Sequence, residues 1–230
     1  MKKIIPVLYV TAITVLIFVS SAYAAGQTRT RTRTGTYQDS NGNSGTSTSS
    51  TIRSPGSKQH SATWTNQNGQ TGSHTSDSTW NKTTDTGTFS SSTTLTNGKT
   101  ESRSGTVAGT APNTYESTGT KTGLNGQTSS FDLTKVKTAT GSTTTGTITG
   151  PKGGVSTVDG TVTKSTGETV KNTEVTGPKG KTDDRIVDTK YNADGSGTRT
   201  IKNTGPDGKT YTRTETFSAP TDTVSPAPQG

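Results

Sequence analysis

Three arginines alternate with threonines near the start of the chain, in the run Thr28-Arg29-Thr30-Arg31-Thr32-Arg33-Thr34. In a β-strand every second side chain points to the same face, so Arg29, Arg31 and Arg33 are expected to form one row. Guanidinium groups bind carboxylate, phosphate and sulfate through paired hydrogen bonds. The row therefore predicts either a polyanion contact or a charged leading strand that blocks edge-to-edge aggregation.

The residues that most often carry catalysis or bind metals lack the spacing for either. His60 and His74 are the only histidines, the chain has no cysteine, and neither histidine has a partner at metal-ligand spacing, so a zinc site would lack ligands. Asp183, Asp184 and Asp188 are interleaved with basic residues, which favours a solvated face over paired catalytic carboxylates. We therefore predict that the protein is not an enzyme and binds no cofactor.

Two weaker motifs have simpler explanations. Gly-Lys-Thr occurs at 98–100, 180–182 and 208–210 but lacks the preceding glycine of a phosphate-binding loop, so nucleotide binding is not expected. Oxygen-bearing side chains at 39–43 and 192–195 leave calcium open as an alternative, although Asn and Asp are equally typical of turns.

The composition limits the class of protein. Only 22% of residues are hydrophobic, whereas an ordinary globular domain has about 45–50%. This excludes an enzyme with a thick core and a polytopic membrane protein. The formal net charge of +8 becomes +6 without Lys2 and Lys3, a mild excess that favours polyanions such as DNA, acidic polysaccharide or an anionic cell surface. Cell-surface polysaccharide or another polyanion is the expected partner, and no specific nucleic acid is expected.

The first 24 residues have the layout of a bacterial secretory signal peptide. Lys2 and Lys3 precede an apolar stretch over 4–19, which leads to Ala22-Tyr23-Ala24, a small-x-small cleavage pattern. Cleavage near Ala24 predicts a secreted protein, extracellular or periplasmic, without a transmembrane span afterwards. A retained anchor helix is the alternative.

A turn-like glycine recurs every 27–29 residues along the chain. The recurring glycines are Gly42, Gly69, Gly98, Gly126, Gly153, Gly180 and Gly208. The first four follow asparagine, and Asn-Gly predicts a two-residue hairpin turn in which both residues have positive φ. The last three end a Gly-Pro-x-Gly sequence, in which proline presets φ for the first turn position and the final glycine is left-handed.

Each unit is therefore predicted to be one β-hairpin. Threonine alternates with other residues between the turns, as in 210–217, and its branched side chain suits a pleated surface. Most units have a second glycine near their middle: Gly56, Gly87, Gly109, Gly141, Gly167 and Gly195.

These features predict an all-β fold, an antiparallel hairpin-repeat array that is either a meander or solenoid-like. Residues 25–37 form an N-terminal strand or arm, 38–217 hold seven hairpins, and the Pro-rich segment 218–230 is a disordered tail.

Scarce aromatic residues are expected to form a thin core: Tyr37, Trp64, Trp80, Tyr115, Tyr191 and Tyr211. The alternative is disorder, because two or three apolar side chains per unit barely offset the entropy of ordering.

The Thr-Gly-Pro-x-Gly-Lys-Thr pattern, with Thr-Arg-Thr runs, resembles secreted bacterial Thr/Gly-rich β-hairpin-repeat proteins over residues 38–217. Asp207-Gly208-Lys209-Thr210-Tyr211 also resembles the hairpin repeats of Rhs/YD-type surface proteins. The Tyr-Asp hallmark of that family is missing, so its encapsulating role is not transferred.

Together these observations predict a structural or adhesive protein of the bacterial surface or biofilm matrix. It would act through many weak hairpin contacts to polysaccharide or another polyanion, or through self-association into fibres. The alternative is an ice- or polysaccharide-binding protein that uses flat rows of threonine.

Overall fold

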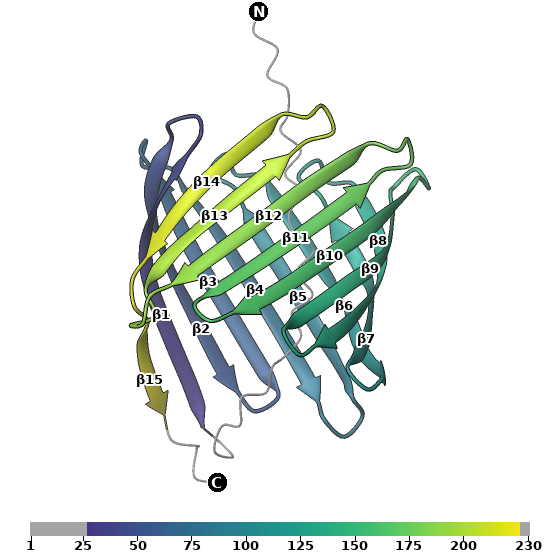
Figure 1. Ribbon diagram of the computed structural model, residues 1–230, viewed down its shortest axis with the longest axis horizontal. Helices are drawn as coiled ribbons and strands as arrows, with labels where there is room; N and C mark the ends of the chain where they lie inside the picture. The colour runs from purple at the N-terminus through teal and green to yellow at the C-terminus, as the bar shows by residue number, and fades with distance from the viewer. Residues whose placement is uncertain (1–26, 226–230) are drawn as a thin grey trace, which may run out of the picture.

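The computed structural model describes residues 27–225, and Figure 1 shows them as a closed β-barrel. Consecutive strands pair antiparallel from β1 to β14, and β14 pairs back to β1. The strands are β1 (Thr28–Asp39), β2 (Ser44–Ser54), β3 (Ser57–Asn66), β4 (Thr71–Asn81), β5 (Thr86–Thr94), β6 (Thr100–Ala111), β7 (Thr114–Thr122), β8 (Thr128–Thr138), β9 (Gly141–Thr149), β10 (Val155–Ser165), β11 (Glu168–Thr176), β12 (Thr182–Tyr191), β13 (Gly197–Thr204), β14 (Thr210–Phe217) and β15 (Thr221–Ser225).

The prediction of an all-β, antiparallel fold is confirmed, but the solenoid-like alternative is wrong. A solenoid leaves its first and last strands far apart, whereas here Gly35–Asp39 of β1 pair with Arg213–Phe217 of β14. Closing the sheet pairs two strand edges that an open array would expose. Within residues 27–225 no helix has the length and hydropathy of a membrane span.

The segment expected to be a disordered tail contains a strand. Thr221–Ser225 form β15, which pairs with Thr28–Thr32 of β1, below the β1–β14 seam. Ala219 and Pro220 separate β15 from β14, and proline interrupts a ladder because it has no N–H. The predicted signal peptide and the last five residues lie outside the described part of the chain.

The seven recurring glycines occupy equivalent turns, which together form one end of the barrel, the repeat-turn rim. In the turn between β11 and β12, the Gly177 N–H donates to the Lys181 carbonyl at 2.8 Å and the Gly180 N–H donates to the Gly177 carbonyl at 2.9 Å. The seven glycines have φ between 69° and 81°. The left-handed final glycine expected for Gly-Pro-x-Gly is confirmed.

The geometry expected for the Asn-Gly turns is wrong in one respect. Gly98 has a φ of 79°, but among the described residues Asp85 and Asn113 are the only non-glycine residues with positive φ. Asn97 therefore does not share the left-handed conformation, which fits a type I turn followed by a left-handed glycine. The Asn97 side-chain oxygen instead accepts the N–H of Lys99 at 3.1 Å.

The second group of glycines divides into two sets. Gly56, Gly167 and Gly195 lie in turns at the other end of the barrel, the opposite rim, and have positive φ. Gly87 and Gly109 lie within β5 and β6, and Gly141 begins β9. A Cβ atom would meet the neighbouring backbone at Gly87 and Gly141 and the Asp85 side chain at Gly109, so glycine at regular spacing marks turns and places of close approach.

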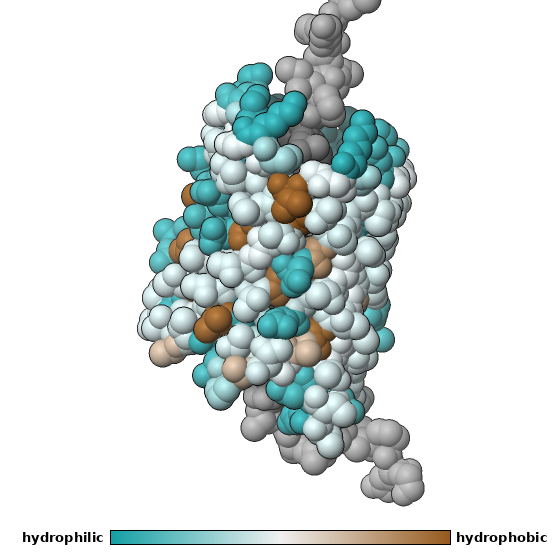
Figure 2. Space-filling model, turned by 90° about the vertical axis from the view of Figure 1, so that its right-hand side faces the viewer, coloured by the Kyte–Doolittle hydropathy of each residue, from teal (hydrophilic) through white to brown (hydrophobic). Residues whose placement is uncertain are grey.

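The outward face of the barrel is built largely from hydroxyl groups. Threonines fill the outward positions of β1 from Thr28 to Thr36, and similar rows continue on the neighbouring strands. Several outward threonine pairs share a hydroxyl hydrogen bond across the strands, including Thr79 with Thr88 at 2.8 Å. Figure 2 accordingly shows a mostly pale wall on which apolar side chains are scattered.

Four of these threonine pairs involve the threonine that lies two residues after a turn glycine, here Gly98, Gly126, Gly180 and Gly208. In each pair, this threonine shares a hydrogen bond with the residue six positions earlier, where the hairpin begins. The pairs are Thr94–Thr100, Thr122–Thr128, Thr176–Thr182 and Thr204–Thr210.

The apolar core lies on the inward face and is small. Phe131, Leu133 and Val158 are buried together, and Phe89 packs against them from β5. The core is thin, as expected, but it is concentrated at β8–β11 and β5. None of the six Tyr and Trp residues predicted to form it belongs to this cluster, and Tyr191 is exposed. Much of the remaining inward face is polar.

Candidate anion-binding site on the inward face

The strand registers sort the charged side chains between the two faces of the barrel. The inward basic residues are Arg29, Arg31, Arg33, Arg53, Lys58, Arg103, Lys121, Lys135, Lys137, Lys164, Lys171, Arg185, Arg199 and Arg213. The inward acidic residues are Asp39, Glu101, Asp183, Glu215 and Asp222. Fourteen basic against five acidic side chains give the inward face an excess of nine positive charges.

The outward face of the strands has the opposite sign. Its acidic residues are Asp77, Glu116, Asp132, Asp159, Glu168, Glu174, Asp184 and Asp188. Its basic residues are Lys190 and Lys202. The remaining charged residues of the described chain lie in turns.

The inward charges are also sorted along the barrel. Near the repeat-turn rim they balance, as in the ion pair of Lys121 with Glu101 at 3.5 Å. Toward the opposite rim, basic side chains outnumber acidic ones, and we call these inward basic residues the basic collar. It consists of Arg29, Arg31, Arg33, Arg53, Lys58, Lys135, Lys137, Lys164, Lys171 and Arg199.

The collar lysines shift one another's ionisation. Burial, followed by the charges of Arg53 and Lys171, lowers the pKa of Lys58 to about 8. Burial, with Lys171, Lys137 and Lys164 nearby, lowers the pKa of Lys135 to about 8. The charge effects on both residues come from cations, so an anion placed among them would remove an electrostatic penalty.

Two acidic groups next to the collar pair with particular arginines. Glu215 pairs with Arg199 at 3.4 Å and with Arg213 at 2.9 Å. Asp222 of β15 pairs with Arg29 and Arg31. The collar also holds five lysines, on β3, β8, β10 and β11, which bring five further positive charges toward the opposite rim.

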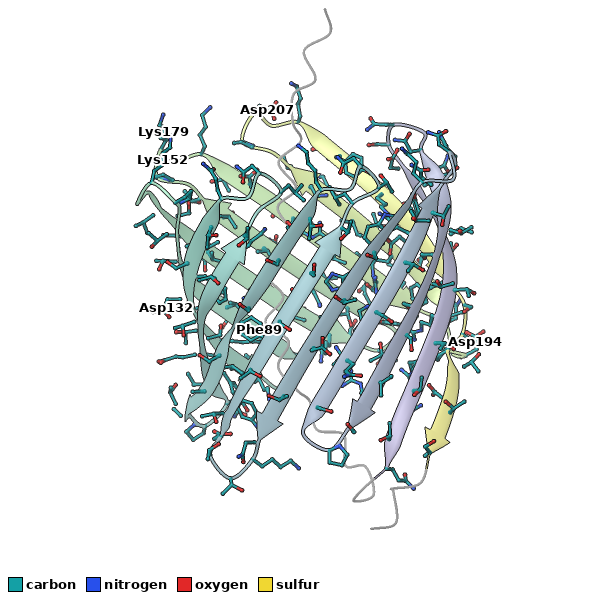
Figure 3. The ribbon with its side chains drawn as sticks, turned by 180° about the vertical axis from the view of Figure 1, so that it is seen from behind. Phe89, Asp132, Lys152, Lys179, Asp194 and Asp207 are labelled. Atoms are coloured by element: carbon teal, nitrogen blue, oxygen red, sulfur yellow. The ribbon has the colours of Figure 1, made fainter. Side chains whose placement is uncertain are left out.

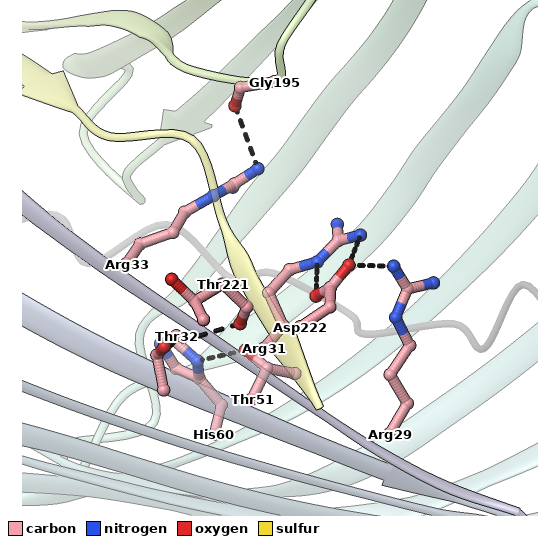
Figure 4. A network of polar contacts seen from close by, with 9 residues as sticks. All are labelled: Arg29, Arg31, Thr32, Arg33, Thr51, His60, Gly195, Thr221 and Asp222. Carbon is pink, nitrogen blue, oxygen red and sulfur yellow. Dashed lines mark hydrogen bonds and ion pairs between the residues drawn. The ribbon is translucent and has the colours of Figure 1, made fainter. Parts of the chain in front are cut away.

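The structure places the three predicted polyanion-binding arginines on the inward side of the β1 seam (Figure 4). Arg31 donates to the Asp222 carboxylate at 2.9 and 3.2 Å, and Arg29 binds the same group. Arg33 donates to the Gly195 carbonyl at 3.2 Å. The row predicted from sequence exists, but it is engaged within the molecule and β1 is not an unpaired edge strand.

Aromatic rings accompany the cations on this side of the barrel. Trp80 and Tyr115 meet edge-on with ring centroids 5.9 Å apart. Lys137 lies over the Tyr115 ring at 4.4 Å and donates to the Tyr115 hydroxyl at 3.0 Å. Rings beside cations suit ligands that combine apolar faces with negative charge, such as acidic sugars.

The histidines also face inward and lie together, with ring centroids 5.9 Å apart. Burial, with Lys58 and His74 nearby, lowers the pKa of His60 to about 4. Its ring is hydrogen-bonded to the Thr51 hydroxyl at 2.9 Å. A neutral, hydrogen-bonded imidazole accounts for this site without a metal.

The acidic motifs are dispersed by the fold. Asp183 faces inward, whereas Asp184 and Asp188 face outward. In the possible calcium loop at 39–43, the Asp39 carboxylate accepts the N–H groups of Asn41 and Asn43 at 2.8 and 2.9 Å. Within residues 27–225 no group of three His, Asp or Glu residues is arranged to hold a metal ion.

The sequence did not reveal the collar because its members are scattered over seven strands. Alternation indicates that Arg29, Arg31 and Arg33 share a face, but not which face. Only barrel closure brings Lys58 of β3 near Lys171 of β11. The sequence nonetheless contained a signal. Within the strands, most lysines and arginines occupy the same alternate positions as the aromatic residues and so share a face with them, whereas most acidic residues occupy the intervening positions.

In comparisons with known proteins, no family model matches the chain and no curated protein matches its sequence.

Proposed function

We propose that this chain is an exported bacterial protein of the cell surface or extracellular matrix that attaches, without catalysis, to acidic polysaccharide. One observation carries the proposal: the excess positive charge gathers in the basic collar, while the outward strand face is acidic. A polyanion is repelled by the outer wall and attracted toward the opposite rim, so the charge distribution both steers and orients it.

The collar supplies many weak contacts. Lys58, Lys135 and Lys171 come from three different strands, and each contributes one cation to a shared field. Contacts along a linear polyanion reinforce one another because binding at one point raises the local concentration at the next. Trp80 and Tyr115 provide ring faces suited to sugar stacking.

The test is binding of the purified chain to polygalacturonate, dextran sulfate and uncharged dextran as a function of salt. We expect binding to both charged polymers, none to dextran, and a linear fall of log affinity with log salt concentration. Single-stranded DNA is a further probe, and tighter binding to DNA than to either polysaccharide would contradict the proposed ligand class.

Matched variants locate the site. The triple variant Lys58→Gln, Lys135→Gln, Lys171→Gln removes three collar charges. The control Lys152→Gln, Lys179→Gln, Lys181→Gln removes three charges from the repeat-turn rim, where Figure 3 places Lys152 and Lys179.

We expect the collar variant to bind at least about tenfold more weakly and to lower the salt slope by about 2. The rim control should change affinity less than about threefold. Equal losses in both variants would show that only net charge matters and that the collar is not the site.

The ice-binding alternative rests on the outward threonine rows. These rows follow the curved wall of a barrel (Figure 1), and pairs such as Thr48 and Thr63 already bond to each other at 2.8 Å. Measurement of thermal hysteresis on the same purified chain decides it, since a clear hysteresis would favour ice over polysaccharide.

A further inference from the structure

Asp222 on β15 occupies a site built from two arginines of β1. Arg31 binds both carboxylate oxygens, through Nε at 2.9 Å and Nη2 at 3.2 Å, and Arg29 binds one of the same oxygens (Figure 4). This is the paired geometry with which guanidinium groups hold carboxylate, sulfate and phosphate. The two arginines therefore form a preorganised oxyanion site.

The strand that supplies Asp222 is weakly attached. All five residues of β15 are exposed, and within residues 27–225 β15 pairs with β1 alone. Ala219 and Pro220 separate it from β14, after the Ser218 N–H donates to the Thr34 carbonyl at 2.8 Å. Short, exposed segments with few partners open at low free energy.

Barrel closure does not depend on β15. The seam is made by Gly35–Asp39 of β1 and Arg213–Phe217 of β14, so β15 can leave β1 without opening the barrel. Its departure would expose Arg29 and Arg31 beside the rest of the basic collar.

We infer that Arg29 and Arg31 form a binding site for the carboxylate or sulfate groups of an acidic polysaccharide, and that Asp222 fills this site until the ligand displaces it together with β15. The inference rests on the proposed function and adds a specific contact to it. Asp222 competes as a charged group, because hydrogen bonds from Arg31 and Arg29 hold the pKa of its carboxyl at about 2.

The test compares Asp222→Asn with Asp132→Asn, which removes the same charge from the outward face of β8. We expect Asp222→Asn to bind polygalacturonate about three- to tenfold more tightly than the wild type, and Asp132→Asn to change affinity less than twofold. Adding Arg31→Gln to Asp222→Asn should abolish the gain.

Hydrogen exchange of the wild-type chain provides a second readout. Saturating polygalacturonate should increase amide exchange at 221–225, while exchange at 213–217 stays unchanged. Equal affinities of the two asparagine variants, or β15 exchange unchanged by ligand, would overturn the oxyanion site while leaving the proposed function in place. No binding by the wild type or Asp222→Asn would overturn both.

Discussion

Phe131 on β8 covers Gly119 on the paired strand β7, so closely that a Cβ atom on Gly119 would lie 2.6 Å from the ring and 2.1 Å from the Ser104 carbonyl oxygen. The same relationship recurs along the inward face, where an aromatic ring lies over a glycine of the neighbouring strand. The other pairs are Tyr37–Gly45, Trp64–Gly72, Trp80–Gly87, Phe89–Gly105 and Phe217–Gly197. Large rings over glycines let a sheet curve while shielding the bare backbone.

We expect Gly119→Ala to destabilise the barrel by about 1–3 kcal/mol, because the added methyl group meets backbone on one side and a ring on the other. Urea denaturation measures the change. Gly160→Ala is the matched control, since its Cβ would come no closer than 3.5 Å to another residue. Equal destabilisation by both substitutions would show that the Phe131 contact is not the cause.

The left-handed turn glycines make a second prediction. Gly180→Ala should cost about 1–2 kcal/mol, because φ at this position is +69° and a Cβ atom is strained in this region. Its surroundings are open, so no steric clash contributes. Gly177→Ala in the same turn, where a Cβ would make ordinary contact with the Lys181 carbonyl oxygen at 3.5 Å, should cost clearly less in the same urea titration.

The outward hydroxyl pairs are expected to stabilise the hairpins modestly. A double-mutant cycle of Thr79→Val and Thr88→Val, which keeps both side chains branched, should give a coupling of about 0.2–1 kcal/mol. Thr79→Ser should retain most of the coupling with Thr88 because it keeps the hydroxyl group. A cycle with no measurable coupling would mean that the bond at 2.8 Å contributes nothing net in water.

The crowded collar predicts a pH-dependent stability. Burial, with Arg53 and Lys171 nearby, lowers the pKa of Lys58 from 10.5 to about 8, so the unfolded chain binds more protons between these two values. The destabilisation from Lys58 is therefore full below pH 8 and fades as the pH rises toward 10.5.

Lys58→Gln should consequently be more stable than the wild type at pH 7, with a difference that shrinks by pH 10. Urea titrations at pH 7, 8.5 and 10 measure it. The control is Lys190→Gln on the outward face, which should show no such trend. A constant difference between Lys58→Gln and the wild type at all three pH values would contradict the prediction.

The local structure could be predicted from the sequence, because hairpins and turns are encoded by neighbouring residues. Gly180 and Pro178 specify their turn within five residues, and the alternating threonines specify strands. Closure could not be predicted, because it depends on the pairing of Tyr37 with Glu215, far apart in the chain. The collar forms only in the closed barrel. From the sequence, therefore, only its arginine row on β1 could be predicted, and Asp222, the partner of that row, could not.

The seam between β1 and β14 also constrains how the chain folds. Every other pairing from β1 to β14 joins consecutive strands, so each hairpin can form locally as it emerges, at little loop-closure cost. Ring closure and the pairing of β15 with β1 require contacts across nearly the whole described chain, and such long-range pairing is slow. The barrel is therefore completed only after its seventh hairpin is available, and until then both outer strands remain open to pairing with another copy.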